Sequence, residues 1–331
     1  MISLLYKRLI AMFAIIIVLA AVIFYLQHIS PLDPVHAQLG AQASASAVAE
    51  RRHELGLDRP ISVQFWNYLK GLAHGDLGTS YRTRRPVTTD LGKYLPATLE
   101  LTLAGLIIAI FLAMLLAFGT ILKWPGSRLF RAILMVGAST PTFLLAIAGI
   151  IIFYQKLGWL PASGRTGLNN VPTGPTRLLV VDGVLHGQLS VSTDAIKHLF
   201  LPALAIALGP AVSIGRVLRS SLLADLHSDY ARTARAKGLS ELGVLRKHVL
   251  RNALGAALSM TGLQVGLMFA GVLVVEQVFG WPGIGQYVAQ SIPVADFPAI
   301  AGVTLMLGVA YIVINTAVDI LQAVADPRIN A

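Results

Sequence analysis

Six long stretches of this chain are almost free of Asp, Glu, Lys and Arg, and no other feature constrains the fold as strongly. A helix of about 20 apolar residues is long enough to cross the hydrocarbon core of a bilayer. The sequence therefore predicts an all-α polytopic membrane protein with six transmembrane helices. The six stretches are Leu9–Gln27, Leu101–Leu122, Ala132–Gln155, His198–Gly215 with an extension to about Leu223, Asn252–Val275 and Phe297–Val318.

The composition agrees with a lipid environment. Of the 331 residues, 55% are hydrophobic and 13% are charged, whereas soluble domains carry about 25% charged residues. The net charge of +10 could indicate a nucleic-acid partner. A chain this apolar is not typical of nucleic-acid-binding proteins, and basic residues beside membrane spans explain the excess better. We therefore expect the lipid bilayer, and no nucleic acid, as a partner.

Sequence motifs for catalysis or cofactor binding are absent. The lack of cysteine excludes disulfides, zinc–thiolate sites, iron–sulfur clusters and cysteine nucleophiles. There is no P-loop, no HExxH and no GxSxG, and the eight His residues are scattered. We expect no catalytic residue, no cofactor and no metal site.

Charged residues are nearly missing from the spans. Only Arg216, Arg219 and Asp319 come close, and all three lie near one end of a span. Proton- and ion-coupled transporters place ionisable groups at mid-membrane. A transporter without such groups needs an external source of energy. A stand-alone secondary transporter and a polytopic membrane enzyme remain as alternative classes.

The basic residues next to the spans predict the orientation. Lys7 and Arg8 precede the first span, three basic residues lie in loop 123–131, and eight follow the fourth span. By the positive-inside rule, both termini of this multi-pass membrane protein are cytoplasmic. The first apolar stretch exceeds the 7–15-residue core (roughly) of a cleaved signal peptide, so we expect it to remain as a helix.

This topology divides the chain into three parts. Residues 1–29 form the first span with a cytoplasmic N-terminus. Residues 30–95, which are rich in aromatic side chains, form a periplasmic lobe. Residues 96–331 form a five-helix core that contains one sizeable cytoplasmic loop, 225–251.

Loop 225–251 has the pattern of two short helices. Ser228 or Asp229 can cap a helix over Tyr230–Lys237, and Gly238 can end it in a left-handed conformation. Ser240 can cap a second helix. Two interpretations stay open: a basic helix pair resting on anionic lipid, or a helix that docks a cytoplasmic protein through a small face formed by two alanines, Ala231 and Ala234.

Five strings, in this order and spacing on a six-helix plan, resemble the inner-membrane permease subunits of bacterial peptide-type (dipeptide and oligopeptide) ABC importers. This family belongs to the binding-protein-dependent transport systems. The strings are Leu55–Pro60 with Gln64-Phe65, Gly75–Ser80 with Pro86-Val87, Leu95–Leu101, Phe279–Gly285 and Asp326–Ile329. The segment from Arg177 to Gly187 resembles an insert of dipeptide-type members.

The cytoplasmic loop is similar to the signature by which such permeases couple to their ATPases. Arg232-Thr233-Ala234 stands where the family has Glu-Ala-Ala, and Gly238 follows at the family spacing. The Glu, the Ile and the Pro of the signature are replaced here. The resemblance implies an ATPase-coupling site formed by Tyr230, Arg232, Thr233, Ala234, Gly238, His248 and Leu250.

The resemblance also assigns roles on the opposite side of the membrane. Gly75, Asp76 and Gly78 would belong to a lobe that contacts a solute-binding protein, where the plain alternative is a cap over helix ends. A second set would contribute to a periplasmic gate, where the plain alternative is a turn at the membrane interface anchored by its tryptophan. These residues are Glu276, Trp281, Pro282 and Gly283.

Taken together, the resemblance implies a type I ABC importer permease fold and a non-catalytic subunit of an ATP-driven importer of peptides. It also implies a multi-pass location in the bacterial cytoplasmic (inner) membrane. Its partners would be a second homologous permease subunit, two cytoplasmic ABC ATPase subunits and a periplasmic or lipid-anchored solute-binding protein. ATP hydrolysis would occur in the ATPase subunits. Nickel or another small solute is the alternative substrate.

Overall fold

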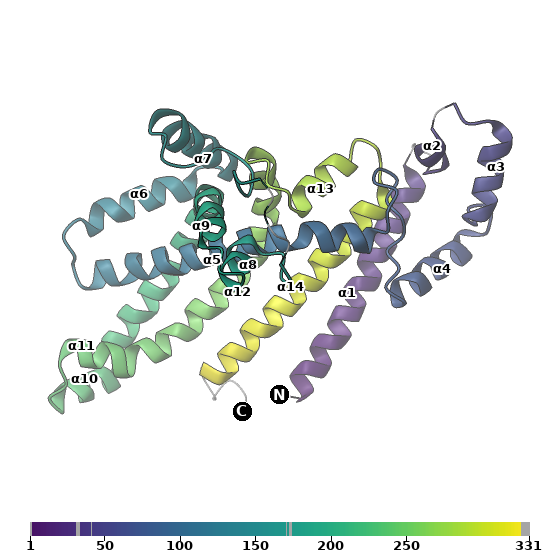
Figure 1. The fold of residues 1–331 in the computed structure, drawn as a ribbon. Helices are drawn as coiled ribbons and strands as arrows, with labels where there is room; N and C mark the ends of the chain where they lie inside the picture. The colour runs from purple at the N-terminus through teal and green to yellow at the C-terminus, as the bar shows by residue number, and fades with distance from the viewer. Residues whose placement is uncertain (1, 31–33, 41, 170, 172–173, 326–331) are drawn as a thin grey trace. The chain divides into compact units, whose positions relative to one another are not determined.

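The computed structural model describes residues 2–30, 34–40, 42–169, 171 and 174–325, and the regular elements within these ranges are helices joined by loops (Figure 1). Thr79 and Pro86 form an isolated antiparallel bridge, the sole strand-like pairing in the described residues. The string Asp326–Ile329 lies outside these residues. The first half of the chain forms α1 (Ile2–Ile29), α2 (Pro34–Leu39), α3 (Ala45–Glu54), α4 (Ile61–Ala73), α5 (Val87–Ile121), α6 (Ser127–Ser139), α7 (Thr142–Gly149) and the π-helical turn η1 (Ile150–Lys156).

The second half contains three helices of 29 residues or more. Its elements are α8 (Leu179–Leu185), α9 (Leu189–Leu226), α10 (Asp229–Ala236), α11 (Glu241–Val244), the π-helical turn η2 (Leu245–Val249), α12 (Leu250–Val278), α13 (Ile284–Ser291) and α14 (Phe297–Ala325).

Five helices or continuous helix runs are long and apolar enough to cross a membrane, and a bent pair makes a sixth if it counts as one span. The all-helical membrane fold expected from the sequence is thereby confirmed. Several spans are longer than the uncharged stretches. The second begins at Val87, and the fourth begins at Leu189. Pro202 and Pro210 lie inside α9, as expected for prolines in membrane helices.

The third expected span, over 132–155, is wrong as a continuous helix. The chain breaks between α6 and α7, which meet at 115°. Thr140 has extended backbone angles (φ −91°, ψ 134°), and Pro141 occupies the position before α7. A proline disfavours helical geometry in the residue before it and donates no backbone hydrogen bond, so this pair ends one helix and starts another.

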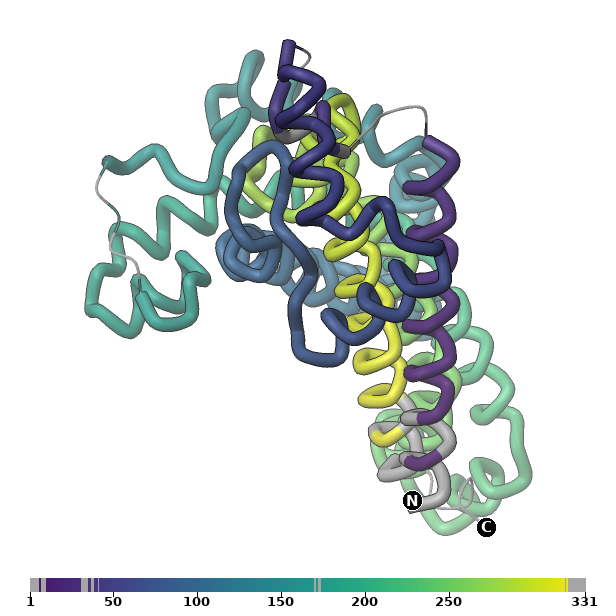
Figure 2. The backbone as a smooth tube through the Cα atoms, turned by 90° about the vertical axis from the view of Figure 1, so that its right-hand side faces the viewer, coloured from purple at the N-terminus to yellow at the C-terminus, as the bar shows by residue number. Residues whose placement is uncertain are grey.

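The chain folds as two compact units, whose boundaries fall inside α5, between α12 and α13, and inside α14. One unit comprises residues 2–98 and 282–312. In it, α1 runs beside the first part of α14 (Figure 2), where Ala20 and Ile23 pack with Ala301 and Leu305. A second cluster joins the start of α5 to α13 and α14 and has Val87, Ile284, Tyr287 and Val303 among its buried members.

The other unit comprises residues 99–281 and the chain from Val313. Its centre is α9, which packs against α5, α6 and α12. Small residues permit this close approach: a Cβ on Gly215 of α9 would lie 3.1 Å from the backbone oxygen of Ala113 in α5. The opposite side of α5 exposes an apolar stripe at helical spacing, as expected of a helix in lipid. The stripe is Leu103, Ile107, Phe111 and Met114.

Candidate functional site

The loop between α9 and α12 folds as the sequence predicts. The Ser228 hydroxyl accepts a hydrogen bond from the Ala231 amide (3.4 Å) and caps α10. Gly238 follows α10 with φ +83°, and the Ser240 hydroxyl accepts from the Gly243 amide (3.2 Å) to cap α11. The helix itself ends at Ala236, one residue before the expected end at Lys237. In Figure 1, α10 and α11 lie close together where α9 leads into α12.

The alanine face of α10 packs inward. Ala231 and Ala234 are buried, with 0% and 5% of their surface exposed, in one apolar cluster with Leu218 and Leu222 of α9 and Val249 of η2. The expectation that this small face is free to enter a partner's groove is therefore wrong. A hairpin of two short helices needs its own core, and the alanines supply the close contact within it.

The outward side of the loop carries different members of the expected coupling set. Tyr230, Arg232, Thr233, Gly238 and His248 are exposed. Ala234 is buried, and Leu250 is half-buried against the apolar cluster. The expected set therefore divides into a solvent-facing part and a part that supports the loop from within.

An ion pair that the sequence analysis did not single out holds the two loop helices together. Arg235 donates to both carboxylate oxygens of Glu241, from Nε at 2.7 Å and from Nη2 at 3.2 Å, and its Nη1 donates to the Leu226 carbonyl at 3.0 Å. The hydrogen bond to Glu241 raises the pKa of Arg235 above its ordinary value. The bidentate geometry orients α10 against α11 on both sides of Gly238. The signal for it was a basic and an acidic residue flanking a predicted turn.

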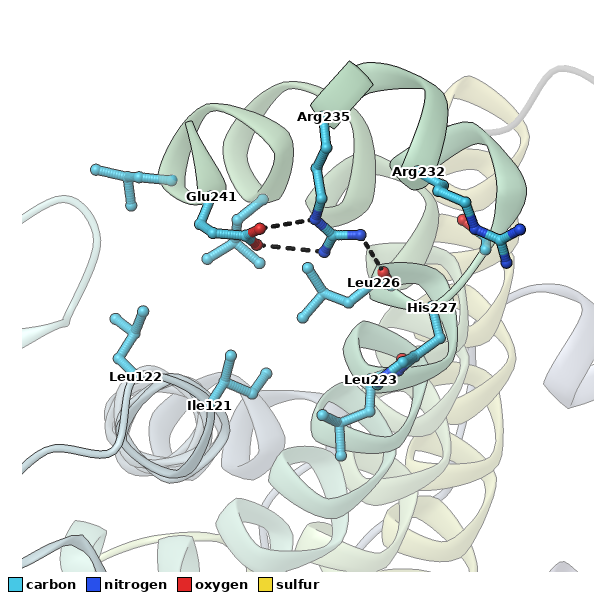
Figure 3. Close-up of a pocket in the computed structure, with 11 residues that line it drawn as sticks. Ile121, Leu122, Leu223, Leu226, His227, Arg232, Arg235 and Glu241 are labelled. Carbon is cyan, nitrogen blue, oxygen red and sulfur yellow. Dashed lines mark hydrogen bonds and ion pairs between the residues drawn. The ribbon is translucent and has the colours of Figure 1, made fainter. Parts of the chain in front are cut away.

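A groove of about 540 Å³ lies beside this ion pair (Figure 3). Apolar residues from the end of α5 and the end of α9 line it, and Arg232, Arg235 and Glu241 stand at its polar side. The apolar lining residues include Ile121, Leu122, Leu223, Leu226 and Leu242. Such a groove can receive an apolar side chain of a partner, and its charged residues can pair with a charged residue beside that side chain.

The glycine string of the expected outer lobe forms a tight turn. Gly75 and Gly78 have φ of +77° and +82°, which glycine adopts without strain. The Asp76 carboxylate accepts from the Gly78 amide at 2.8 Å. A Cβ on Gly78 would also lie 3.4 Å from Pro298, so the turn rests closely on the start of α14.

Asp296, which the sequence analysis did not single out, organises the segment that follows this turn. Its carboxylate is fully buried and accepts from the Ser80 hydroxyl and from the amides of Tyr81 (2.9 Å) and Arg82 (3.2 Å). Nearby, the ring of Tyr287 stacks on Tyr94 with centroids 5.1 Å apart. Burial raises the pKa of Tyr287 above its ordinary value, so its hydroxyl stays neutral.

Three of the four expected gate residues, Glu276, Trp281 and Gly283, are buried, and the four lie at the ends of two different helices. In the larger unit, Glu276 is 0% and Trp281 is 1% exposed, and the Trp281 amide donates to the Glu276 carbonyl at 2.8 Å. The alternative of Trp281 as a lipid-interface anchor is therefore wrong. In the smaller unit, Pro282 is exposed, and Gly283 is an extended residue that precedes α13.

Two acids, Glu100 and Asp182, hold the loop between η1 and α9; both lie in strings that resemble the family, but neither was assigned a role of its own. Glu100, 7% exposed, accepts from the Arg165 guanidinium and from the Val180 amide at 2.9 Å. Arg165 also lies over the Trp281 ring, 5.6 Å from its centroid. Asp182 accepts from the Thr176 hydroxyl at 2.7 Å. The signals for Glu100 were its place in the string Leu95–Leu101 and its charge at the entry of an apolar span.

Within the described residues, no group of three or more His, Cys, Asp or Glu side chains could hold a metal ion. The acids described above are instead paired with amides, hydroxyls and the guanidinium groups of Arg165 and Arg235. They position loops at the helix ends.

These features define a class: a polytopic helical membrane subunit with a folded loop of two short helices between its fourth and fifth apolar segments. The chain belongs to the family of binding-protein-dependent transport system inner membrane components, whose model matches residues 94–331, and the N-terminal model of the same family matches residues 1–102. Members of this family are non-catalytic membrane components of ABC transporters. The family assignment inferred from the sequence is confirmed.

Several relatives match over nearly the whole chain. A dipeptide transport system permease protein of Alkalihalophilus pseudofirmus is 40% identical over 98% of this chain and 98% of its own length. A probable D,D-dipeptide transport system permease protein of Escherichia coli is 39% identical over 93% and 91%. A glutathione transport system permease protein of Salmonella typhimurium is 35% identical over 98% and 97%.

Proposed function

We propose that this subunit carries short peptides across the cytoplasmic membrane as part of an ATP-driven importer. The observation that supports this substrate class most directly is the agreement among the relatives, whose names specify dipeptides, D,D-dipeptides and glutathione, itself a short peptide. The matches leave out almost none of the chain. The nearly uncharged spans suit a subunit that takes its energy from elsewhere.

We further propose the assembly: a second homologous permease, two cytoplasmic ATPases and an extracytoplasmic solute-binding protein. Both termini and loop 225–251 then face the cytoplasm. A reporter fused after Arg251 should give a cytoplasmic signal, and a reporter fused within residues 40–90 should give an extracytoplasmic one. The opposite pattern would contradict this orientation.

Loop 225–251 is our proposed contact with an ATPase. Its solvent-facing side presents Tyr230, Arg232, Thr233 and His248, and of these Arg232 lines the groove. The buried alanines and the Arg235–Glu241 pair hold this side in one shape, which lowers the entropy lost on docking. We propose that movement of the ATPases acts on the membrane helices through α9 and α12, to which the loop is joined directly.

The outer segments have proposed roles as well. The turn at Gly75, Asp76 and Gly78 would form part of the surface that receives the binding protein. Glu276, Trp281, Pro282 and Gly283 would form part of the outer gate. The burial of Glu276 and Trp281 and the extended backbone of Gly283 suit a segment that transmits movement between neighbouring helices.

Uptake of labelled peptides tests the substrate proposal. A host that lacks its own peptide importers would express the chain together with the candidate partner permease, ATPases and binding protein. We expect uptake of a labelled dipeptide or tripeptide that excess unlabelled peptide suppresses and nickel does not. Nickel uptake without peptide uptake would overturn the peptide proposal and leave the family assignment untouched.

A further inference from the structure

A second hollow, separate from the groove in Figure 3, lies where α5 gives way to α6. Its volume is about 450 Å³. Four basic side chains from three parts of the chain line it, and no acidic residue is among the described residues around it. The basic residues are Lys123, Arg128, Arg131 and Arg219.

The positive charge of this hollow has no counter-charge in the part of the chain that the structure describes. Among the described residues, no carboxylate pairs with Lys123, Arg128 or Arg131, in contrast to Arg235, which Glu241 neutralises. Arg219 is fixed in place because its Nε donates to the Thr120 hydroxyl at 3.1 Å. Its terminal nitrogens therefore remain as donors for a further acceptor.

The start of α6 adds to the same field. This helix of 13 residues begins after Gly126 with no side-chain cap and with no acidic residue in its first turn. Its first amides therefore carry a partial positive charge without a local counter-charge. An anionic group in the hollow would be attracted by the four side chains and by these amides together.

The surroundings of the hollow are those of a membrane interface. Trp124 lines it, is 45% exposed and packs on Gly119 of α5. Beyond Arg128 and Arg131, the exposed arc of α6 continues with Leu129, Ile133 and Val136, each more than 60% exposed. A soluble anion would leave this apolar arc exposed, whereas the acyl chains of a lipid would cover it.

We propose that this hollow binds the phosphate group of an anionic phospholipid headgroup. The basic side chains and the α6 amides would contact the phosphodiester, Trp124 would lie at the glycerol level, and the acyl chains would follow α6. Basic pockets between membrane helices are a known form of anionic-lipid recognition. The bound lipid would hold the α5–α6 connection in place beside α9.

Quenching of Trp124 fluorescence tests the proposal. The full chain, purified with its associated subunits, would be reconstituted into phosphatidylcholine vesicles that contain phosphatidylglycerol, with the bromine label on one lipid or the other. The chain has four tryptophans, so the emission of the Trp124→Phe variant is subtracted to obtain that of Trp124 alone. We expect brominated phosphatidylglycerol to quench it more than brominated phosphatidylcholine does at the same mole fraction.

The matched variants remove equal charge inside and outside the hollow. Arg128→Gln with Arg131→Gln should lower the phosphatidylglycerol preference by about fivefold for each arginine removed. Arg216→Gln with Arg251→Gln, at exposed positions outside the hollow, should leave it unchanged. Arg128→Lys with Arg131→Lys keeps both charges, so it should retain most of the phosphatidylglycerol preference, and it serves as the control for folding.

Three results would overturn the proposal. One is equal quenching by the two brominated lipids in the unaltered chain. Another is an equal loss of preference in the Arg216/Arg251 control, which would indicate only a general surface potential. The third is release of quenching by inorganic phosphate but not by chloride at equal ionic strength, which would assign the hollow to a soluble phosphate compound.

Discussion

Replacing Gly238 separates backbone strain from steric clash in the proposed coupling loop. The residue has φ +83°, and a Cβ built on it would meet no atom within 4 Å. Any effect of a substitution must therefore come from the left-handed conformation itself. That conformation costs about 1–2 kcal/mol for a residue with a Cβ, more for a β-branched residue, and least for Asn.

These costs are large for a small loop. A change of 1–2 kcal/mol shifts the ratio of formed to unformed turn by roughly 5- to 30-fold. We therefore expect loop integrity to fall in the order Gly, Asn, Ala, Val at position 238. Insertion into the membrane should not change, because the apolar spans carry that signal themselves.

Two measurements on the reconstituted importer check this order. Hydrogen exchange of the α10 and α11 amides reports the turn directly, and stimulation of ATPase activity by the loaded binding protein reports coupling. Gly255→Ala is the matched control, because a Cβ on Gly255 would also meet no atom within 4 Å, whereas Gly255 lies inside α12 without a positive φ. Equal protection and equal stimulation for Gly238→Asn, Gly238→Val and the unaltered chain would refute the reasoning.

Three further substitutions test other parts of the structure. Ala234→Trp should overfill the buried core of the loop, at a cost of about 1–3 kcal/mol or more. It should therefore speed hydrogen exchange of the α10 amides even when no ATPase is present, and unchanged exchange would contradict the inward packing. Asp296→Ala leaves the hydrogen-bond donors of residues 80–82 without their acceptor, which costs about 1–3 kcal/mol for each donor that stays buried. This segment should therefore become sensitive to protease. Asp76→Ala removes one exposed turn contact and should have a smaller effect. Glu100→Gln keeps an acceptor but removes the charge facing Arg165, so a thermal-shift assay should show lower stability than for Glu50→Gln, and equal midpoints would argue against a structural role for the ion pair.

Much of the fold is legible in the sequence because its causes are local. A run of about 20 apolar residues partitions into lipid whatever surrounds it, so the spans and their order could be predicted. The caps at Ser228 and Ser240 and the left-handed turn at Gly238 depend on neighbours a few residues away, and they too were found correctly. The break at Thr140-Pro141 also had a local signal, the proline itself. Prolines are tolerated inside many membrane helices, however, so the proline alone did not predict the bend.

What only the tertiary structure decided is which residues meet across long separations. The sequence shows that Ala231 and Ala234 form a small face, but their burial depends on where α9 and η2 lie. Glu100 joins Arg165 and Val180, and Asp296 joins Ser80–Arg82, through hydrogen bonds that span from 65 to 216 positions. Spacing carries no information about such pairs, since it is the packing of the helices that brings the donors within reach of the carboxylates. The same packing gathers Lys123, Arg128, Arg131 and Arg219 around one hollow, whereas the sequence alone shows them only as basic residues beside different spans.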